Sequence, residues 1–405
     1  MLYHAYQTQS DLFEPWRAFA ELGAEALAQP AFGSSRLARS FAAALEMFAV
    51  ARLTHSRPHY GIGTVAVTGH EGRVAVIEEE VCKLPFGTLL RFRRQGVGPQ
   101  PRVLIVAPMS GHFATLLRDT VQTMLSDHDV YITDWHNARD VPVRAGRFGL
   151  SEYTDHLIRF LEALGPGAHV IAICQPCVSA LAAAAVMAED DHQAQPRTLT
   201  LMAGPIDCRI NPTEVNRLAN GRPIGWFRRN LISTVPGRYP GAFRRVYPGF
   251  VQLLAFMRMN LGRHCGAFTD LYRDLRNGDR LKAQITRTFY DEYFAVLDLA
   301  AEFYLETVQQ VFQEHALPRG QLHWHDRLID PRAIRRTALL TVEGERDDIC
   351  SIGQTVAAHD LCDSIRPYLK QHYVQTGVGH YGVFAGKRWQ QGIYPRVRDH
   401  IHSHD

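Results

Sequence analysis

Residues 169–185 read HVIAICQPCVSALAAAA, and this stretch decides the fold. Residues 169–173 form a short apolar run typical of a buried strand, and the alanine-rich run that begins near Val178 favours a helix. Cys174 and Cys177 stand at the junction between the two elements. Such a junction can carry redox, metal-binding or nucleophilic chemistry, and the rest of the chain must decide among these.

Short apolar runs alternate with helical stretches on both sides of this junction. Such alternation predicts an α/β fold with a mostly parallel sheet, the strands being joined by crossover helices. The predicted strands are residues 103–107, 130–133, 169–173, 199–203, 338–342 and 372–376.

The long gap before the last two predicted strands indicates an insertion. Residues 208–335 have a mostly helical pattern, as in 288–312, and we expect them to form a cap or lid. The core then comprises 1–207 and 336–405. Its first part is a preamble with helical spacing over 11–27 and 35–53, followed by a predicted hairpin within 63–94.

Composition excludes few function classes but sets the expected compartment. The 405 residues are 46% hydrophobic and carry a net charge of +3, too small to imply nucleic acid as a partner. We find no signal peptide and no run of eighteen apolar residues, so we expect a soluble, cytoplasmic protein that does not enter a membrane. Seven cysteines, an odd number spread through a long chain, fit a reducing compartment.

The spacing of Cys174 and Cys177 also occurs in thiol-disulfide redox proteins, which remain one alternative. Against that alternative, the strand before Cys174 is the third of at least four in a long parallel run. A zinc site is another alternative, but it needs further ligands close by. One close histidine pair, His323 and His325, lies in the insertion without a cysteine pair near it. We therefore expect no metal.

Nucleophilic attack from Cys174 fits the junction better. In an α/β-hydrolase the nucleophile stands on a tight turn between a strand and a helix, and the triad acid and histidine follow later strands in that order. The stretch after 338–342 offers Asp347, with Asp348 as its nearest rival. The loop after 372–376 offers His380, with His372 inside the strand as the structural alternative.

The oxyanion formed in such a reaction needs two backbone N–H donors. One comes from the residue after the nucleophile, here Gln175, and one from the loop after the strand at 103–107. In that loop Met109 and Ser110 are both candidates, and the sequence does not choose between them. His112 in the same loop is a weaker candidate as a base.

Several stretches together resemble the intracellular polyhydroxyalkanoate depolymerases, which degrade poly(3-hydroxybutyrate) granules. The resemblance extends over nearly the whole chain. The stretches that carry it are MLYHAYQ, TDWHNARDVP, AICQP, MAGPIDCRINPTEVN, AEFYLETVQQVFQEHALPRG and LLTVEGERDDI followed by GQT.

The resemblance implies a cysteine-nucleophile α/β-hydrolase with its triad on Cys174, Asp347 and His380, in agreement with the strand order. Related polyhydroxyalkanoate synthases keep glycines after the nucleophile, where this chain has Gln175 and Pro176. That departure favours a depolymerase over a synthase-like acyltransferase. The resemblance, with its cysteine nucleophile, also implies a 3-hydroxyacyl thioester intermediate, no cofactor, and water or coenzyme A as the acyl acceptor.

A water-insoluble substrate also implies apolar surface for contact with the granule. The aromatic-rich part of the insertion is the richest candidate, and from it we expect Trp226, Phe243 and Tyr247 to contact polymer or granule. A granule-coating protein without turnover remains an alternative, and the sequence leaves the oligomeric state open.

Overall fold

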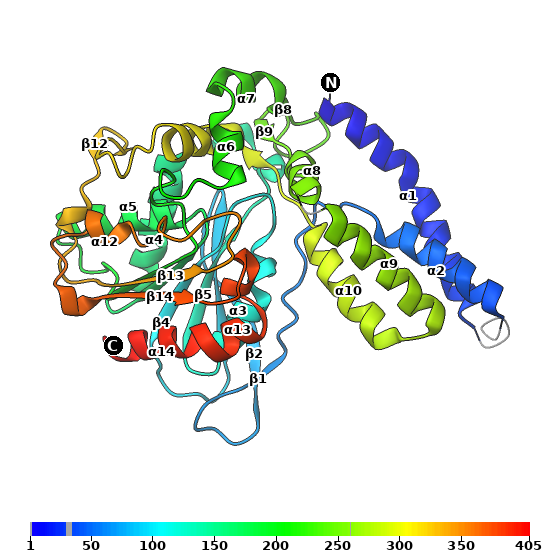
Figure 1. The fold of residues 1–405 in the computed structure, drawn as a ribbon, viewed down its shortest axis with the longest axis horizontal. Helices are drawn as coiled ribbons and strands as arrows, with labels where there is room; N and C mark the ends of the chain where they lie inside the picture. Colours follow the sequence, from blue (N-terminus) through cyan, green and yellow to red (C-terminus); the bar gives the residue numbers. More distant parts are fainter. Residues whose placement is uncertain (1, 30–34, 260) are drawn as a thin grey trace.

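A sheet of nine strands forms the centre of the molecule (Figure 1). The computed structural model describes residues 2–29, 35–259 and 261–405. The strand order across the sheet is β1-β2-β3-β5-β4-β6-β7-β13-β14. The strands are β1 (Thr64–Ala66), β2 (Arg73–Leu84), β3 (Gly87–Arg94), β4 (Arg102–Val106), β5 (Asp129–Trp135), β6 (His169–Ile173), β7 (Thr198–Met202), β13 (Ala338–Gly344) and β14 (Lys370–Gln375).

The sheet is antiparallel at one edge and parallel elsewhere. Strands β1, β2, β3 and β5 pair antiparallel, and from β5 through β4, β6 and β7 to β13 and β14 every neighbour is parallel. The swapped positions of β4 and β5 place the chain crossover beside β6. This order, with an antiparallel start and a parallel remainder, is that of an α/β-hydrolase, as the sequence predicted.

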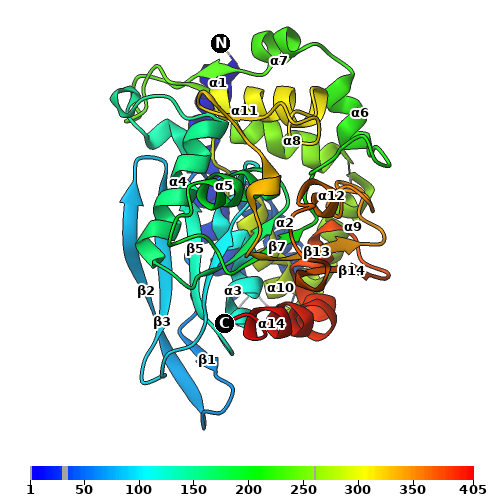
Figure 2. The ribbon, with the colours of Figure 1, turned by 90° about the vertical axis from the view of Figure 1, so that its left-hand side faces the viewer.

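Helices cover both faces of the sheet (Figure 2). Helices α4 (Leu150–Leu164) and α5 (Cys177–Glu189) pack together on one face, whereas α3 (Arg118–Met124) and the C-terminal α14 (Tyr394–His402) lie on the other. The short helix α12 (Ala358–Leu361) lies between β13 and β14, and the short helix α13 (Gly386–Arg388) lies between β14 and α14. The central strands are buried on both faces, which explains their nearly continuous apolar sequences.

The segment between β7 and β13 adds further helices and two small sheets. Its helices are α6 (Glu214–Asn220), α7 (Ile224–Asn230), α8 (Gly249–Met259), α9 (Leu261–Asn277), α10 (Arg280–Tyr293) and α11 (Ala301–Glu306), which continues as a π-helical turn over Thr307–Gln313. Its strands are β8 (Ser233–Thr234), β9 (Arg245–Tyr247), β10 (Leu299–Ala300), β11 (His323–Trp324) and β12 (Arg327–Leu328).

The helical pattern over 288–312 is interrupted in the structure. Helix α10 ends at Tyr293, and the chain then extends to pair with Thr54, with the loop after β4 and with β9. Tertiary pairing of this extended segment overrides its helical spacing, so the helical pattern over 288–312 holds only on either side of it.

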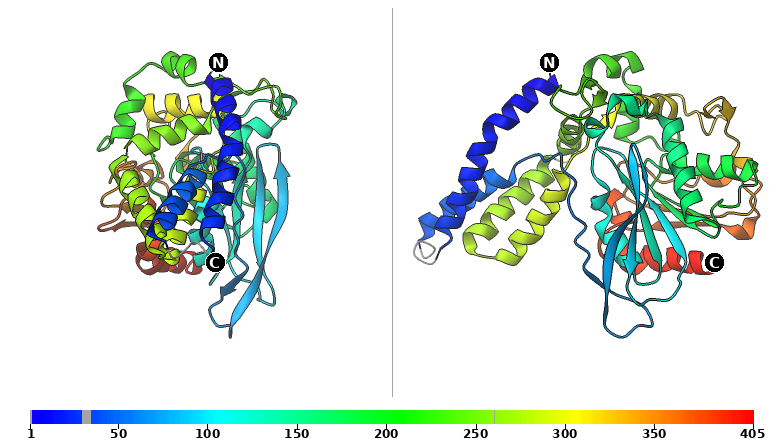
Figure 3. Two further views of the ribbon diagram at one scale, coloured as in Figure 1. Left: turned by 90° about the vertical axis from the view of Figure 1, so that its right-hand side faces the viewer. Right: turned by 180° about the vertical axis from the view of Figure 1, so that it is seen from behind.

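Four helices form an arm that projects from the hydrolase body (Figure 3). They are α1 (Leu2–Leu27) and α2 (Arg36–Val50) from the N-terminus, together with α9 and α10. Helix α2 packs on α1, α9 and α10. We call these four helices the arm. The division of the chain into a core and a cap at 208–335 remains a prediction.

The beginning of α1 is anchored to the body by a buried polar contact. The Tyr3 hydroxyl donates to Oδ2 of Asp298 at 2.5 Å, and the backbone N–H of Gly249 donates to Oδ1 of the same carboxyl at 2.8 Å. The Tyr6 ring stacks on Phe250, with 4.0 Å between ring centroids. No helix in the described part of the chain is long and apolar enough to cross a bilayer.

Candidate active site

Cys174 stands on a strained turn between β6 and α5. Its φ of 66° is in the left-handed region, which costs a residue with a Cβ about 1–3 kcal/mol. Two hydrogen bonds hold the turn: the Cys174 N–H donates to the Met202 carbonyl at 2.8 Å, and the Cys174 carbonyl accepts from the Cys177 N–H at 3.1 Å. Pro176 follows in helical conformation, where its missing N–H leaves no bond unmade. The geometry is that of a nucleophile elbow.

The close approach of α5 to the neighbouring strand depends on Gly204. A Cβ at this position would lie 2.2 Å from both Cβ and Sγ of Cys177. Only a residue without a side chain therefore fits between β7 and the start of α5. The sequence analysis did not single out Gly204, because its role depends on a packing distance.

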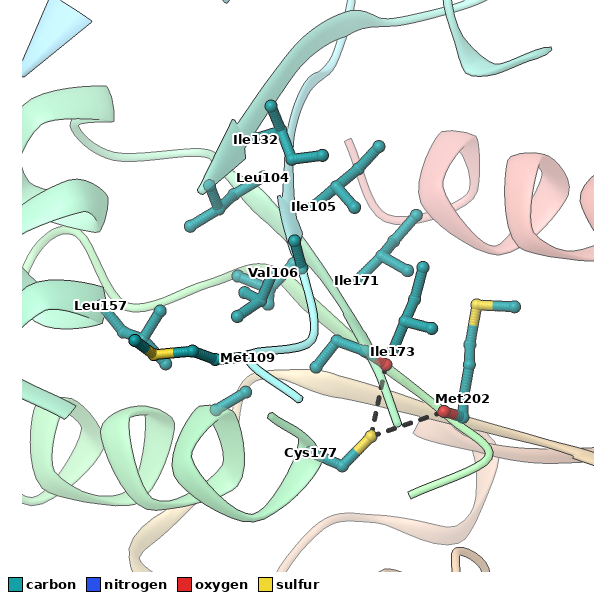
Figure 4. Close-up of a cluster of buried hydrophobic side chains, with 14 of the residues drawn as sticks. Leu104, Ile105, Val106, Met109, Ile132, Leu157, Ile171, Ile173, Cys177 and Met202 are labelled. Carbon is teal, nitrogen blue, oxygen red and sulfur yellow. Dashed lines mark hydrogen bonds between the residues drawn. The ribbon is translucent and has the colours of Figure 1, made fainter. Parts of the chain in front are cut away.

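The two cysteines have different surroundings. Cys177 is fully buried among aliphatic side chains of the sheet, and its thiol donates to the carbonyls of Ala172 at 3.3 Å and Met202 at 3.7 Å (Figure 4). Burial raises the pKa of the Cys177 thiol well above its ordinary value, with a smaller contribution from Cys174. All seven cysteines are free. Cys177 therefore resembles a packing residue, whereas Cys174 is partly accessible.

Asp347 and His380 come together beside the elbow. Nδ1 of His380 lies 2.8 Å from Oδ2 of Asp347, and both side chains are buried. The other oxygen of Asp347 accepts from the backbone N–H groups of Ile349 and Cys350 at 2.9 and 2.8 Å. These bonds fix the carboxylate at the end of β13. Asp348 is exposed, and its neighbour Asp347 is the residue that pairs with His380.

Burial and two neighbouring side chains determine the charge of His380. Burial disfavours the protonated ring, but the electrostatic effects of the adjacent Cys174 sulfur and of the Asp347 carboxylate, which accepts a hydrogen bond from the ring, outweigh this and raise the pKa of His380 well above its ordinary value. The ring is therefore poised to hold a proton taken from the thiol. His372, the alternative, instead lies in β14 near the Thr341 hydroxyl.

The three candidate oxyanion donors, Met109, Ser110 and Gln175, line the same cavity as Cys174 and His380. Among the residues described, their backbone N–H groups donate no hydrogen bond to protein. The loop that carries Met109 is held from both sides: the Ala107 carbonyl accepts from Trp135 Nε1 at 2.9 Å, and the Gly111 carbonyl accepts from the Leu297 N–H at the same distance. The donors are thus free and their loop is fixed.

His112 in this loop is buried, and burial lowers its pKa to about 4, against a smaller opposing effect of a backbone hydrogen bond with Tyr293. It is a neutral packing residue at pH 7. His323 and His325 lie in the β11–β12 hairpin, with Nε2 of His325 3.0 Å from Asp155. Across residues 2–29, 35–259 and 261–405, no group of three or more His, Cys, Asp and Glu side chains is arranged to hold a metal ion.

The cavity has a volume of about 260 Å³ and mostly apolar walls. Its floor is the elbow and His380, and its upper wall comes from the segment between β7 and β13. Wall residues from this segment are Val215, Leu218, Phe227, Tyr247, Phe256, Phe303, Tyr304, Val308 and Phe312. Such a site can accept a short aliphatic chain and exclude most water around the thiol.

The three aromatic residues expected to contact the granule do not form one surface. Tyr247 is buried, with its ring stacked on Tyr304 at 3.8 Å between centroids, so it offers no exposed surface to a granule, and its contact with substrate stays a prediction. Its place in β9 turns it toward the cavity instead. Phe243 is 77% exposed, and Trp226 is half-buried against Phe227.

The sheet order, the strained Cys174 and the buried Asp347–His380 pair define an α/β-hydrolase. A model of the family described as "PHB de-polymerase C-terminus" matches residues 203–405. The chain belongs to this poly(3-hydroxybutyrate) depolymerase family and is a carboxylic ester hydrolase. The matched part contains Asp347 and His380, and the elbow lies before it.

Similar solved structures are distant. The 2-hydroxy-6-oxo-6-phenylhexa-2,4-dienoate hydrolase of Rhodococcus sp. strain RHA1 is 13% identical, with a TM-score of 0.43, over 81% of this chain and 99% of that one. A thermophilic esterase from Thermogutta terrifontis is also 13% identical, with a TM-score of 0.39, over 84% of this chain and 98% of that one. No curated protein sequence matches the chain.

Proposed function

We propose that the protein cleaves the ester bonds of poly(3-hydroxybutyrate) and similar short-chain polyhydroxyalkanoates with Cys174 as nucleophile. The observation that carries the proposal is the His380 ring, which lies between the Asp347 carboxylate and the Cys174 thiol at the floor of an apolar cavity. An aliphatic polyester with short side chains presents apolar methyl and methylene groups to such a cavity and an ester carbonyl to the thiol.

In the first half of the reaction His380 takes the thiol proton and the sulfur attacks an ester carbonyl. The carbonyl oxygen becomes an oxyanion, which accepts hydrogen bonds from the N–H of Gln175 and from that of Met109 or Ser110. The ester C–O bond then breaks, and His380 returns its proton to the departing alkoxide. The acyl group stays on Cys174 as a 3-hydroxyacyl thioester.

In the second half a water molecule gives a proton to His380 and its oxygen attacks the thioester. The C–S bond breaks, 3-hydroxybutyrate or an oligomer leaves as the acid, and the thiol is restored. The thiol of coenzyme A is an alternative acceptor, since it exchanges one thioester for another of similar energy. The reaction needs no cofactor beyond the acceptor.

We further propose that the protein acts in the cytoplasm at the surface of polyhydroxyalkanoate granules. Its seven free cysteines suit a reducing compartment. This location would bring the enzyme to its insoluble substrate.

The test is release of soluble 3-hydroxybutyrate from amorphous polymer by three purified proteins. Wild type should release product, Cys174→Ala should release none, and Cys177→Ser should keep most activity because a hydroxyl can still donate to the Ala172 carbonyl. Equal loss in both variants would favour a dithiol reaction. Wild type that binds polymer without releasing product would indicate a coating protein.

A further inference from the structure

The outer surface of the arm carries large apolar side chains in regular rows. On α1, Leu12, Trp16 and Phe19 follow the i, i+4, i+7 spacing of one helix face, and Trp16 and Phe19 are 64% and 71% exposed. Leu22, one turn further, is exposed as well. An apolar helix face normally packs on the protein core, and here it faces solvent.

Two further helices of the arm repeat this arrangement. Helix α2 exposes Leu37 and Phe41, four residues apart, and α10 exposes Leu281, Ile285 and Phe289 at the same interval. The rows of α1 and α2 meet where the rings of Phe13 and Phe48 make an edge contact, with 6.4 Å between centroids. We call these exposed residues the arm rows.

On α1 and α2, the buried residues inside the arm are small: Ala20, Ala24 and Ala43. The large buried residues of the arm lie on α9 and α10 and include Leu271, Tyr290 and Tyr293. On α1 and α2, small residues inside and large apolar residues outside reverse the usual distribution. Because these large side chains are not used to pack the arm, their exposure needs an external contact.

Charge indicates what that contact is. The four arm helices contain nine basic and nine acidic residues, so they lack the excess of Lys and Arg that recruits a protein to anionic lipid. An uncharged aliphatic polyester matches a neutral apolar surface. On α8, which connects the arm to the body, Leu254 is exposed and Phe256 lines the cavity, so large apolar side chains also stand between the arm and the site.

The base of the arm also holds it in a fixed relation to the reacting groups. Where the arm joins the body, Thr54 after α2 pairs with Ala295 after α10. Two residues later the Leu297 N–H donates to the Gly111 carbonyl, in the loop that carries the oxyanion candidates. A polymer segment bound along the arm would therefore lie at a defined distance from Cys174.

We propose that the arm rows are the surface by which this protein binds the water-insoluble polyester. This inference rests on the proposed function for the identity of the polymer. In this proposal the arm rows make the main contact with the polymer, in place of the aromatic-rich part of the insertion around Tyr247.

The experiment compares two matched triple variants. The arm variant is Leu12→Gln, Trp16→Gln and Phe19→Gln, which keeps good helix formers on α1. The control changes three exposed apolar residues of the hydrolase body to Gln: Val143, Leu328 and Tyr368. Binding is measured by co-sedimentation with amorphous poly(3-hydroxybutyrate) in a Cys174→Ala background, and cleavage of a soluble 3-hydroxybutyrate dimer ester is measured in the active background.

The arm variant should bind polymer at least tenfold more weakly and cleave the soluble ester within twofold of wild type, while the control stays unchanged in both. Polymer binding equal to wild type would overturn the proposal. If polymer binding were equal, and if the variant were a monomer while wild type is a dimer, the arm rows would instead be the surface that binds a second copy of the chain. Binding to phosphatidylglycerol vesicles in preference to polymer would also overturn it.

Circular dichroism checks that the arm variant is folded. If it is not, Trp16→Gln alone repeats the comparison, and a threefold or greater loss of polymer binding is required of this single variant. Should wild type bind polymer through the arm but cleave no ester, the proposed function would fail while the binding surface stood.

Discussion

Asp347 and Asp348 are neighbours in the chain with opposite surroundings. The first is buried against His380 and two backbone N–H groups, and the second is exposed. We predict that Asp347→Asn lowers kcat on a soluble ester roughly 10³- to 10⁴-fold, because an amide can no longer orient and charge-balance the imidazolium. Asp348→Asn is the matched control and should stay near wild type. The reverse ranking would assign the acid to Asp348.

Cys174→Ser keeps an attacking atom but changes its acidity. His380 and Asp347 are arranged around a thiol, and a hydroxyl ionises far less readily. We predict a fall in kcat/KM of at least about 10²-fold on the soluble ester, with little change in stability. Turnover close to wild type would contradict the role of the thiolate.

At the scale of elements, the elbow depends on how closely α5 approaches β7. Gly204→Ala would put a methyl group 2.2 Å from Sγ of Cys177, so helix or strand must shift. We predict a loss of about 1–3 kcal/mol in the free energy of unfolding, together with reduced esterase activity as the elbow moves. Gly237→Ala is the control, since nothing lies within 4 Å of its added Cβ. Equal denaturation midpoints for the two variants would contradict this account.

Most strands could be predicted from the sequence because each central strand is a short apolar run between polar turns. Cys174, Asp347 and His380 could be located for the same reason: each follows a recognisable strand, and strand ends meet at one edge of a parallel sheet. The predicted strands at 103–107, 130–133, 169–173, 199–203, 338–342 and 372–376 are confirmed within a few residues.

The contacts of the arm and the burial of the aromatic residues could not be predicted. Helical periodicity identifies an apolar face, but it does not say which helix, or whether any helix, covers it. The spacing over 11–27 and 35–53 predicts helices, but it does not tell that large apolar residues of α1 and α2 are exposed. Phe243 and Tyr247 stand four residues apart in an irregular segment, where no period relates them, and one is exposed while the other is buried.

At the scale of the whole molecule, the Asp298 carboxyl ties the arm to the body and should make stability depend on pH. Burial raises the pKa of Asp298 to about 6, partly offset by its hydrogen bonds with Tyr3 and Gly249. The folded protein thus holds this proton more tightly than the unfolded chain. The resulting stabilisation is complete below the ordinary carboxyl pKa near 4 and is lost as the pH rises through about 6.

We therefore predict that the stability difference between wild type and Asp298→Asn changes by up to about 3 kcal/mol from pH 4 to pH 7, with wild type losing ground as the pH rises. Urea titrations of both proteins at several pH values measure it. Asn keeps an acceptor for the Gly249 N–H, so the variant should fold. A difference that does not vary with pH would mean that Asp298 ionises normally.

The arm also sets the order in which the chain can be completed during synthesis. Helices α1 and α2 emerge from the ribosome before their partners α9 and α10, which follow about two hundred residues later. At bacterial and eukaryotic rates of elongation that interval is roughly 10–40 s. Throughout it, the helices that carry Trp16, Phe19 and Phe41 have no α9 or α10 to pack against, while the hydrolase sheet is still being assembled. The nascent chain thus exposes the large apolar side chains of α1 and α2 before the helices that pack on them have been made. This makes α1 and α2 a natural target for chaperones that bind during translation.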